Sequence, residues 1–276
     1  MTIQHNPLKQ YFRRPTIYIK LPSGGKYYAP GVINQTENGE LPVYPMTAID
    51  DITSQTPDAL FNGSAVVELI KSCIPDIREP WLINNIDLDA ILIAIRSASA
   101  GNNLDIDTIC PKCNEESKYG LNLTGLLSTI KAGDYSKELQ INELTIKFRP
   151  LTYKEINEVS MHQFELQKMF TNIEATEDVM EKNIKTKDAL TNIMSISMKV
   201  LATTIEYIRA PSEVVSDNEY IHDFLQNCDK NMYEQVKNYH ENIKKEAELK
   251  PLKVKCIHCE NEYEKSFTLN LSDFFG

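Results

Sequence analysis

The amino-acid sequence predicts an α+β fold with a small β-rich N-terminal part, a ribbon divided into two halves, and a mainly α-helical insert between those halves. Three observations lead to this prediction. Residues 16–46 carry β-branched and aromatic residues between turns rich in Pro and Gly. Two Cys-x-x-Cys pairs, Cys110/Cys113 and Cys256/Cys259, lie far apart in the chain. Between the pairs, apolar residues recur every three or four positions, which is typical of helices with one buried face.

The composition is that of a globular protein. The 276 residues are 42% hydrophobic and 25% charged, which favours one or two domains and excludes wholesale disorder. The formal net charge of −10 argues against free nucleic acid as a partner. Residues 1–15 lack the apolar core of a signal peptide, and no apolar run reaches the roughly 18 residues of a membrane helix. We therefore expect no membrane partner and assembly in a cytoplasm.

The β-rich N-terminal segment spans residues 1–46. Thr16–Leu21 has strand composition, and Pro22-Ser23-Gly24-Gly25 is a turn. Lys26–Tyr28 is then expected to return as a second strand. Asn38-Gly39 marks another turn before a strand at Leu41–Tyr44.

A helical segment is expected over residues 47–101. Thr56-Pro57-Asp58 combines a capping hydroxyl, an early proline and an acid, which predicts a helix start. This helix would run to about Cys73, because Pro75 follows. A second helix is expected from Asp87 to Gly101, since Leu88, Ile91, Leu92 and Ile95 form an apolar stripe.

The insert spans residues 128–250. It should open with a strand pair over residues 139–149, turning at Asn142-Glu143. Thr152 and Glu155 form the capping box of a helix, and we expect the chain to be helical from there to about Glu248, including one helix over Ala189–Ile208.

The two Cys-x-x-Cys pairs indicate a metal site. Four thiolates at about 2.3 Å from the ion make a closed tetrahedral zinc site, and each Cys-x-x-Cys turn places two sulfurs on the same ion. In a reducing cytoplasm this pattern favours metal over disulfides. We therefore predict one structural Zn²⁺ per chain, with four ligands: Cys110, Cys113, Cys256 and Cys259.

The residues after the two pairs repeat the same pattern. Each pair leads through an acidic turn into an alternating strand, which ends in Asn122-Leu123-Thr124 in the first copy and Asn270-Leu271-Ser272 in the second. This pattern predicts a split zinc ribbon made of residues 102–127 and 251–276. The metal would tie together the ends of the insert, and its binding would offset the entropy of closing so long a loop.

Other roles for the cysteines fit less well. A thioredoxin-like redox motif needs one Cys-x-x-Cys at a helix start, whereas here there are two with strand-like flanks. A catalytic zinc keeps one position open, and four thiolates leave none. His258 could replace a thiolate but is expected at the surface. Cys73 and Cys228 are isolated and are expected to be small buried residues.

Catalytic signatures are missing from the sequence, so we assign no catalytic and no cofactor-binding residues. Gly24-Gly25-Lys26 lacks the full phosphate-loop pattern, because Tyr27 stands where Ser or Thr would hold magnesium. Asp87 and Asp89 would point to different faces of a helix, and Asp105 and Asp107 are expected to end a turn. The role of the basic, aromatic segment at residues 11–14 stays open between a docking arm and a disordered terminus.

Several segments resemble the baseplate hub and hub-assembly proteins of T4-like contractile-tailed phages. They are Lys20-Leu21-Pro22-Ser23-Gly24-Gly25-Lys26-Tyr27-Tyr28, Pro57–Val66 with Ser72-Cys73-Ile74-Pro75, Asp87–Ala100, Cys110-Pro111-Lys112-Cys113, and Phe148-Arg149-Pro150-Leu151-Thr152-Tyr153. The likeness covers roughly residues 15–160, and only the second cysteine pair marks the C-terminal part.

This resemblance implies a structural or assembly role in the central hub of a phage tail baseplate, without enzymatic activity. It implies docking to other baseplate or hub proteins within a larger oligomer, with the tape-measure and tail-tube proteins as further candidate partners. It also implies a place in the virion tail after assembly in the host cytoplasm. Two alternatives stay open: a zinc-ribbon factor associated with nucleic acid, and a transient assembly chaperone absent from the mature virion.

Overall fold

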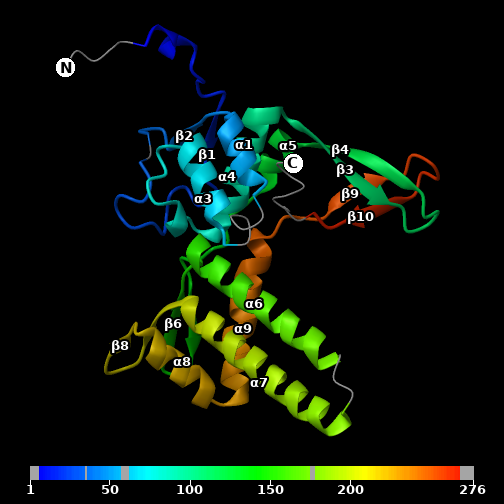
Figure 1. Ribbon diagram of the computed structural model, residues 1–276. Helices are drawn as coiled ribbons and strands as arrows, with labels where there is room; N and C mark the ends of the chain where they lie inside the picture. Colours follow the sequence, from blue (N-terminus) through cyan, green and yellow to red (C-terminus); the bar gives the residue numbers. More distant parts are fainter. Residues whose placement is uncertain (1–5, 35, 57–61, 175–177, 268–276) are drawn as a thin grey trace. The chain divides into compact units, whose positions relative to one another are not determined.

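The protein is a mixed α+β structure in which helices dominate. The computed structural model (Figure 1) describes residues 6–34, 36–56, 62–174 and 178–267. Helices make up 48% and strands 20% of the described residues, and the strands form small sheets, as the sequence predicts. The chain divides into two compact units. Met1–Pro80, Asp87–Ile130 and Leu249–Gly276 form the first, and Trp81–Ile86 with Lys131–Glu248 forms the second.

The first unit begins with a short 3-10 helix, η1 (Pro7–Tyr11), and a two-stranded sheet. Strand β1 (Ile17–Lys20) pairs antiparallel with β2 (Glu40–Val43), so that Ile17 faces Val43 and Ile19 faces Leu41. The expected return strand at Lys26–Tyr28 is wrong. The chain turns there instead, with positive φ at Gly24, Gly25 and Tyr27, which is incompatible with extended backbone.

Three helices follow in this unit. Helix α1 (Ala48–Ser54) starts at a capping box formed by Thr47 and Asp50, and α3 is Ser64–Cys73. The predicted start at Thr56-Pro57-Asp58 lies largely outside the described residues. The predicted second helix is confirmed as α4 (Asn85–Ala100), which ends at Gly101 with a φ of 87°. This helix is buried on more than one side. Ile91, Ile93 and Ile95 point in different directions round the helix, and all three are fully buried.

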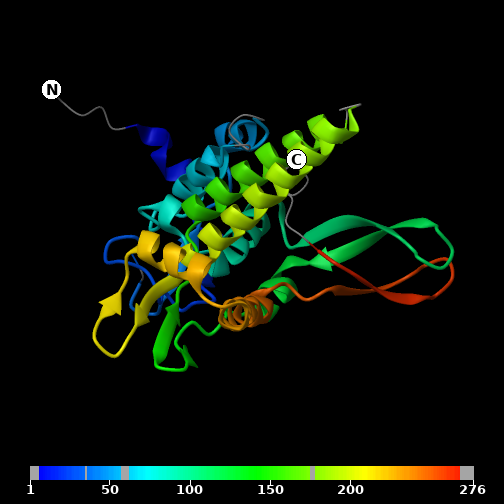
Figure 2. The same ribbon diagram turned by 90° about the horizontal axis from the view of Figure 1, so that it is seen from below.

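Two β-hairpins complete the first unit, and they lie side by side (Figures 1 and 2). The first pairs β3 (Asn103–Ile109) with β4 (Glu116–Asn122) and leads into α5 (Leu123–Thr129). The second pairs β9 (Leu252–Lys255) with β10 (Glu262–Lys265). Asp105 and Asp107 do not end a turn as expected. They occupy exposed alternate positions of β3, whose other face is partly covered.

The second unit contains a four-stranded antiparallel sheet in the order β5-β6-β7-β8. Its strands are β5 (Glu138–Ile141), β6 (Leu144–Phe148), β7 (Ile205–Arg209) and β8 (Val214–Val215). The first two form the predicted hairpin, which turns at Asn142 with a φ of 53°. The helix predicted over Ala189–Ile208 is wrong at its end. The chain leaves the helix at Thr204, and Ile205 and Ile208 enter β7, because pairing with β6 buries both.

Four helices accompany this sheet. Helix α6 (Tyr153–Glu174) starts at the predicted capping box, in which Thr152 and Glu155 exchange hydrogen bonds. It packs against α7 (Val179–Thr203), and α8 (Asn218–Asn227) and α9 (Lys230–Ala247) follow. No helix in the described ranges is both long and apolar enough to cross a bilayer.

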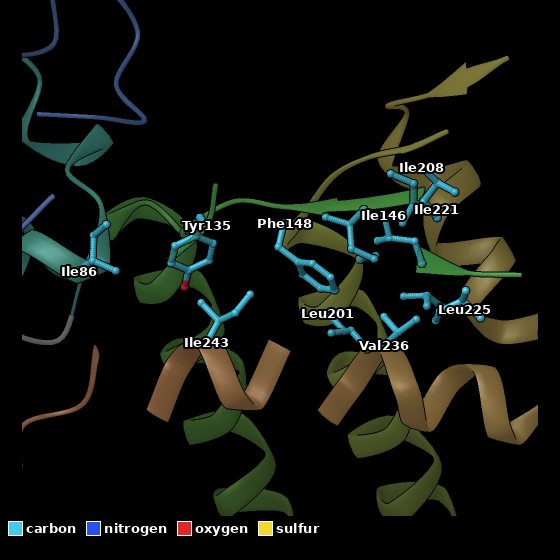
Figure 3. Close-up of a cluster of buried hydrophobic side chains, with 13 residues drawn as sticks. Ile86, Tyr135, Ile146, Phe148, Leu201, Ile208, Ile221, Leu225, Val236 and Ile243 are labelled. Atoms are coloured by element: carbon cyan, nitrogen blue, oxygen red, sulfur yellow. The ribbon is translucent and has the colours of Figure 1, made fainter. Parts of the chain in front are cut away.

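Figure 3 shows the core of the second unit, where side chains from the sheet meet those of α7, α8 and α9. Phe148 and Ile146 come from the central strand β6, and Leu201, Leu225 and Val236 come from the three helices. Each is at least 95% buried. Burying such side chains contributes about 1.5–3 kcal/mol apiece, so this core gives the unit a source of stability of its own.

Candidate metal centre

Each hairpin of the first unit ends in a Cys-x-x-Cys knuckle. In the first hairpin, Cys110 directly follows β3, and its backbone N–H donates to Glu115 O at 3.1 Å. The N–H of Asn114 donates back to Cys110 O at 2.9 Å. Asn114 has a φ of 57°, which lets the chain reverse and enter β4. This turn directs the thiols of Cys110 and Cys113 to the same side.

The second knuckle repeats these contacts. Cys256 N–H donates to Asn261 O at 2.9 Å, and Glu260 N–H donates to Cys256 O at 3.0 Å. Glu260 has a φ of 54°. The two knuckles therefore adopt the same backbone turn, although residues 114–255 separate them in the sequence.

The four thiols gather into one cluster. Sγ of Cys110 lies 3.6 Å from Sγ of Cys259, and Sγ of Cys113 lies 3.7 Å from Sγ of Cys256. All four sulfurs lie within 4.8 Å of one another. A tetrahedral ion with bonds of about 2.3 Å places its sulfurs about 3.8 Å apart. The cluster therefore has the dimensions of a four-thiolate metal site, and each pair of close sulfurs joins one hairpin to the other.

Backbone donors and burial surround the sulfurs. The N–H of Lys112 donates to Cys110 Sγ, and the N–H of His258 donates to Cys256 Sγ, both at 3.4 Å. Cys110 and Cys256 are buried, whereas Cys113 and Cys259 are partly exposed. Such N–H···S contacts favour the thiolate form, which is the form that binds metal.

The proton affinities of the two thiols in the first knuckle differ strongly. Desolvation acts to raise the pKa of Cys110, but backbone N–H donors and the adjacent thiols outweigh it and lower the pKa to about 6. The N–H of Glu115 acts to lower the pKa of Cys113, but desolvation and the three neighbouring sulfurs raise it to about 12. The negative charge of one thiolate in the cluster thus disfavours the ionisation of the neighbouring thiols. A bound cation would remove this repulsion and hold all four as thiolates.

Residues 15–276 match the model of the T4 bacteriophage base plate protein family. The chain belongs to this family. No curated protein and no solved structure matches the chain. Family membership makes it a T4-like phage baseplate protein, with a place in the virion tail among other phage tail proteins.

The other candidate ligands of the baseplate protein lie outside the cluster. His258 is exposed on the second knuckle, as expected. Cys73 is fully buried, and Cys228 is partly buried at the end of α8. Burial raises the pKa of the Cys73 thiol to about 11, which keeps it protonated and unreactive. Within the described residues, the only group of cysteine, histidine or acidic side chains close enough to share a metal is the four-cysteine cluster.

Sequence reasoning missed a buried polar network in the first unit. The carboxylate of Asp87 is fully buried on α4, where it accepts hydrogen bonds from Ser23 N–H at 2.8 Å, Ser23 Oγ at 2.5 Å and Tyr28 Oη at 2.7 Å. Burial still raises the pKa of Asp87, despite these three donors. The contacts fix the Ser23–Tyr28 turn on the helix, which explains why this segment does not form a strand. Asp89 accepts no comparable set of hydrogen bonds from the residues that the structure describes, and burial raises its pKa.

Arg13 was also missed as a structural residue. Its guanidinium donates to Pro45 O at 2.5 Å, to Ser72 O at 2.8 Å and to Asp50 Oδ2 at 3.3 Å. The segment at residues 11–14 is therefore anchored at Arg13, while the side chains of Tyr11 and Phe12 are exposed. The sequence shows only that Arg13 is a basic residue beside aromatic ones. It does not show which groups accept hydrogen bonds from its guanidinium.

Proposed function

We propose that this protein is a structural or assembly component of the central hub region of the phage baseplate, acting by protein–protein docking. A single structural Zn²⁺ would hold its two hairpins together through Cys110, Cys113, Cys256 and Cys259. Membership in the baseplate protein family supports the first part. The observation that carries the second part is the cluster of four sulfurs within 4.8 Å of one another.

The ligand set favours a structural ion over a catalytic one. Four thiolates saturate a tetrahedral zinc and leave no position for water or substrate. Soft sulfur ligands also favour zinc over magnesium or calcium, which prefer oxygen. We therefore propose no enzymatic activity for the site.

In this proposal the chain has four parts. A β-rich segment over residues 1–46 and a helical segment over 47–101 precede the first half of the ribbon, residues 102–127. The helical insert over 128–250 leads to the second half, residues 251–276. Zinc would close the loop that contains the insert, because the two knuckles have no covalent link other than the chain between them.

Native mass spectrometry before and after treatment with a strong chelator tests the zinc site. We expect one zinc per chain, and loss of native charge states when the chelator removes it. The matched controls are Cys73→Ser and Cys228→Ser, which should keep the metal because both thiols lie outside the cluster. A purified protein without metal, whose four clustered thiols titrate readily, would overturn the zinc proposal and leave the baseplate role unaffected.

The position in the hub needs a test in the phage. A tagged chain should copurify with other baseplate and hub proteins from infected cells, and electron microscopy of labelled virions should place the tag at the centre of the baseplate. A label at the baseplate periphery would contradict the hub assignment. Copurification from cells combined with absence from mature virions would identify an assembly chaperone instead. Salt-dependent binding to DNA or RNA would favour the nucleic-acid alternative.

A further inference from the structure

The segment that precedes β1 is basic, although the chain as a whole is acidic. Residues 6–14 contain Lys9, Arg13 and Arg14 but no acidic residue, whereas the formal net charge of the chain is −10. Arg13 is paired with Asp50. Lys9 and Arg14 are exposed, and neither makes an ion pair with a residue that the structure describes. We name residues 6–14 the basic segment, and two of its cationic side chains are available to a partner.

The basic segment also presents large apolar side chains to solvent. Residues three apart in a 3-10 helix lie on the same face, so η1 places Leu8 and Tyr11 together. Leu8, Tyr11 and Phe12 keep 61%, 76% and 57% of their surface accessible. Aromatic residues and arginine are enriched in protein interfaces relative to the rest of the surface. The composition of the basic segment is therefore that of a docking peptide.

The basic segment is fixed at its base and unpacked toward its tip. Arg13 holds the base on the first unit through its hydrogen bonds to Pro45, Ser72 and Asp50. No residue of η1 is buried, and η1 extends away from the helices of the first unit (Figures 1 and 2). A fixed base presents the exposed side chains at a defined place, which reduces the entropy that binding costs.

The second unit contains an apolar groove between the β7–β8 hairpin and α8. Its volume is about 350 Å³, which lies within the range of binding clefts in proteins. Ile208 and Ile221 line the groove and belong to the hydrophobic core beneath it. Tyr220 and Phe224, one turn apart on α8, also line it, and Tyr220 keeps 71% of its surface accessible. The groove thus continues the core outward to an open aromatic wall.

The charged residues that line this groove are acidic. Among the described lining residues they are Glu213 and Asp223, both exposed, and neither makes an ion pair with another described residue. Residues 205–229 carry six Asp or Glu residues and one Arg. That residue, Arg209, already lies 4.0 Å from Glu138. We name this site the acidic groove, because it combines an apolar floor with carboxylates that lack a cationic partner among the described residues.

The basic segment and the acidic groove are complementary in two independent ways. One offers exposed aromatic side chains and two cations, and the other offers an apolar floor and two carboxylates. Opposite charges around an apolar contact steer association and fix its register. Both surfaces are accessible to solvent in the single chain, so the partner of each comes from another molecule.

We propose that the basic segment of one copy binds in the acidic groove of a second copy. Tyr11 and Phe12 then contact the apolar floor, and Lys9 and Arg14 lie beside the carboxylates of the groove. The contact joins two different surfaces of the chain, so each copy gives one segment and receives one. This proposal concerns self-association within the assembly and does not depend on the zinc site or on the hub position.

Sedimentation equilibrium of the full chain provides the first test. We expect the wild-type protein to self-associate. Tyr11→Ser combined with Phe12→Ser should weaken association by about a hundredfold or more, because buried aromatic anchors carry most of the energy of such contacts. The matched control is Tyr18→Ser, which changes an aromatic residue of β1 with 61% of its surface accessible and should leave association intact. A wild-type protein that stays monomeric at all concentrations would overturn the proposal.

A mixing experiment tests whether two different surfaces meet. Glu213→Lys combined with Asp223→Lys reverses the charge of the groove and should weaken self-association by about tenfold or more. Asp105→Lys combined with Asp107→Lys changes the net charge equally on exposed positions of β3 and should have no effect.

The groove variant retains an intact basic segment, and the Tyr11→Ser/Phe12→Ser variant retains an intact groove. An equimolar mixture of the two should therefore form a 1:1 complex that neither variant forms with itself. A mixture that stays monomeric would contradict the pairing of segment with groove.

A charge exchange separates the interface from a loss of folding. Adding Lys9→Glu and Arg14→Glu to the groove variant restores opposite charges between segment and groove, and self-association should recover. A fourfold variant as weak as the groove variant alone would show that these residues do not face each other.

Photocrosslinking distinguishes a second copy from the same chain. With p-benzoylphenylalanine in place of Phe12, irradiation should give covalent dimers, and peptide mapping should place the link on α8 or the β7–β8 hairpin. The same photoreactive residue in place of Tyr18 is the control and should give no dimer. Links within one chain only, or links to another surface, would overturn the proposal.

Discussion

Asn114 and Glu260 occupy the same position in the two knuckles, and both have left-handed backbone, with φ of 57° and 54°. Each donates its N–H to the carbonyl of the first cysteine of its own knuckle. The turn thus imposes the same backbone conformation on two residues with different side chains. Asn adopts this conformation more readily than Glu, because a short amide can bond to the local backbone.

The substitution Glu260→Gly should therefore stabilise the second knuckle. Glycine has no Cβ to clash in left-handed backbone, and the relief is worth about 1 kcal/mol. The variant loses the exposed ion pair of Glu260 with Lys255 at 3.6 Å, which contributes little. Thermal unfolding of the metal-loaded protein should show a Tm raised by a few degrees at most.

A β-branched residue at the same position provides the opposite test. Glu260→Val should lower Tm, whereas Asn114→Gly should change it little because Asn already tolerates this backbone. Equal stability of Glu260→Val and Glu260→Gly would show that the turn is not strained at this residue.

Removal of one ligand from either knuckle should disrupt the whole cluster. Cys110→Ser and Cys256→Ser each leave three thiols for the ion, and each should abolish stoichiometric zinc and lower Tm by about 10 °C or more, because the binding free energy is also folding free energy. Truncation after Lys250 removes the second hairpin and should have nearly the same effect. Differential scanning calorimetry with metal analysis of the same samples measures both quantities. A Cys110→Ser protein with normal zinc content and normal Tm would contradict the predicted ribbon.

The stability of the protein should depend on pH through the ionisation of the Asp50 carboxyl. Burial acts to raise the pKa of Asp50, but hydrogen bonds from the N–H and Oγ1 of Thr47 and from Ser72 Oγ, together with the charge of Arg13, lower it below its ordinary value. A carboxyl with a lowered folded pKa stabilises the fold above its unfolded pKa of about 4, and this contribution disappears as pH falls through the folded value.

Asp50→Asn should accordingly destabilise the protein by about 1 kcal/mol at pH 7, since the capping box of α1 loses its charged acceptor. The difference from wild type should narrow below pH 4. Asp51→Asn is the matched control on the same helix, because Asp51 is exposed and should change stability little at either pH. Urea titrations at pH 7 and pH 3 measure the comparison, and a difference that is equal at both pH values would contradict it.

Local sequence signals predicted much of the fold because they act over a few residues. The stripe of α4, the turn at Asn142 and the capping box of Thr152 with Glu155 each depend on neighbours in the chain. Strand β7 was missed for the opposite reason. Ile205 and Ile208 are three residues apart, a spacing that also fits a helix, and only pairing with Phe148 and Ile146 of β6 makes the segment a strand.

In the candidate site, too, the local features could be predicted from the sequence and the long-range contacts could not. The Cys-x-x-Cys spacing predicted which sulfurs share a turn, and the repeated flanks predicted that the two turns belong together. The structure adds which sulfurs are closest, Cys110 with Cys259 and Cys113 with Cys256. Nothing in the sequence linked Asp87 to Ser23, because a hydrogen bond across 64 positions depends on the packing of a turn against a helix.

Gly133 offers a sharp test of packing in the second unit. A Cβ at this position would lie 2.7 Å from Ile243 O and 2.9 Å from Ile243 Cγ2, and the first of these atoms belongs to the backbone of α9. Gly133→Ala should therefore force the 131–135 segment away from the helix and destabilise the protein by about 1–3 kcal/mol. Gly120→Ala is the matched control, because its Cβ would meet only Asp105 Oδ1, at 3.7 Å, on an exposed face of β4. That variant should be neutral or slightly stabilising, since Ala restricts the unfolded chain more than Gly. Thermal unfolding of both variants decides the matter, and a Gly133→Ala protein as stable as Gly120→Ala would show that the segment does not pack against Ile243 as closely as described.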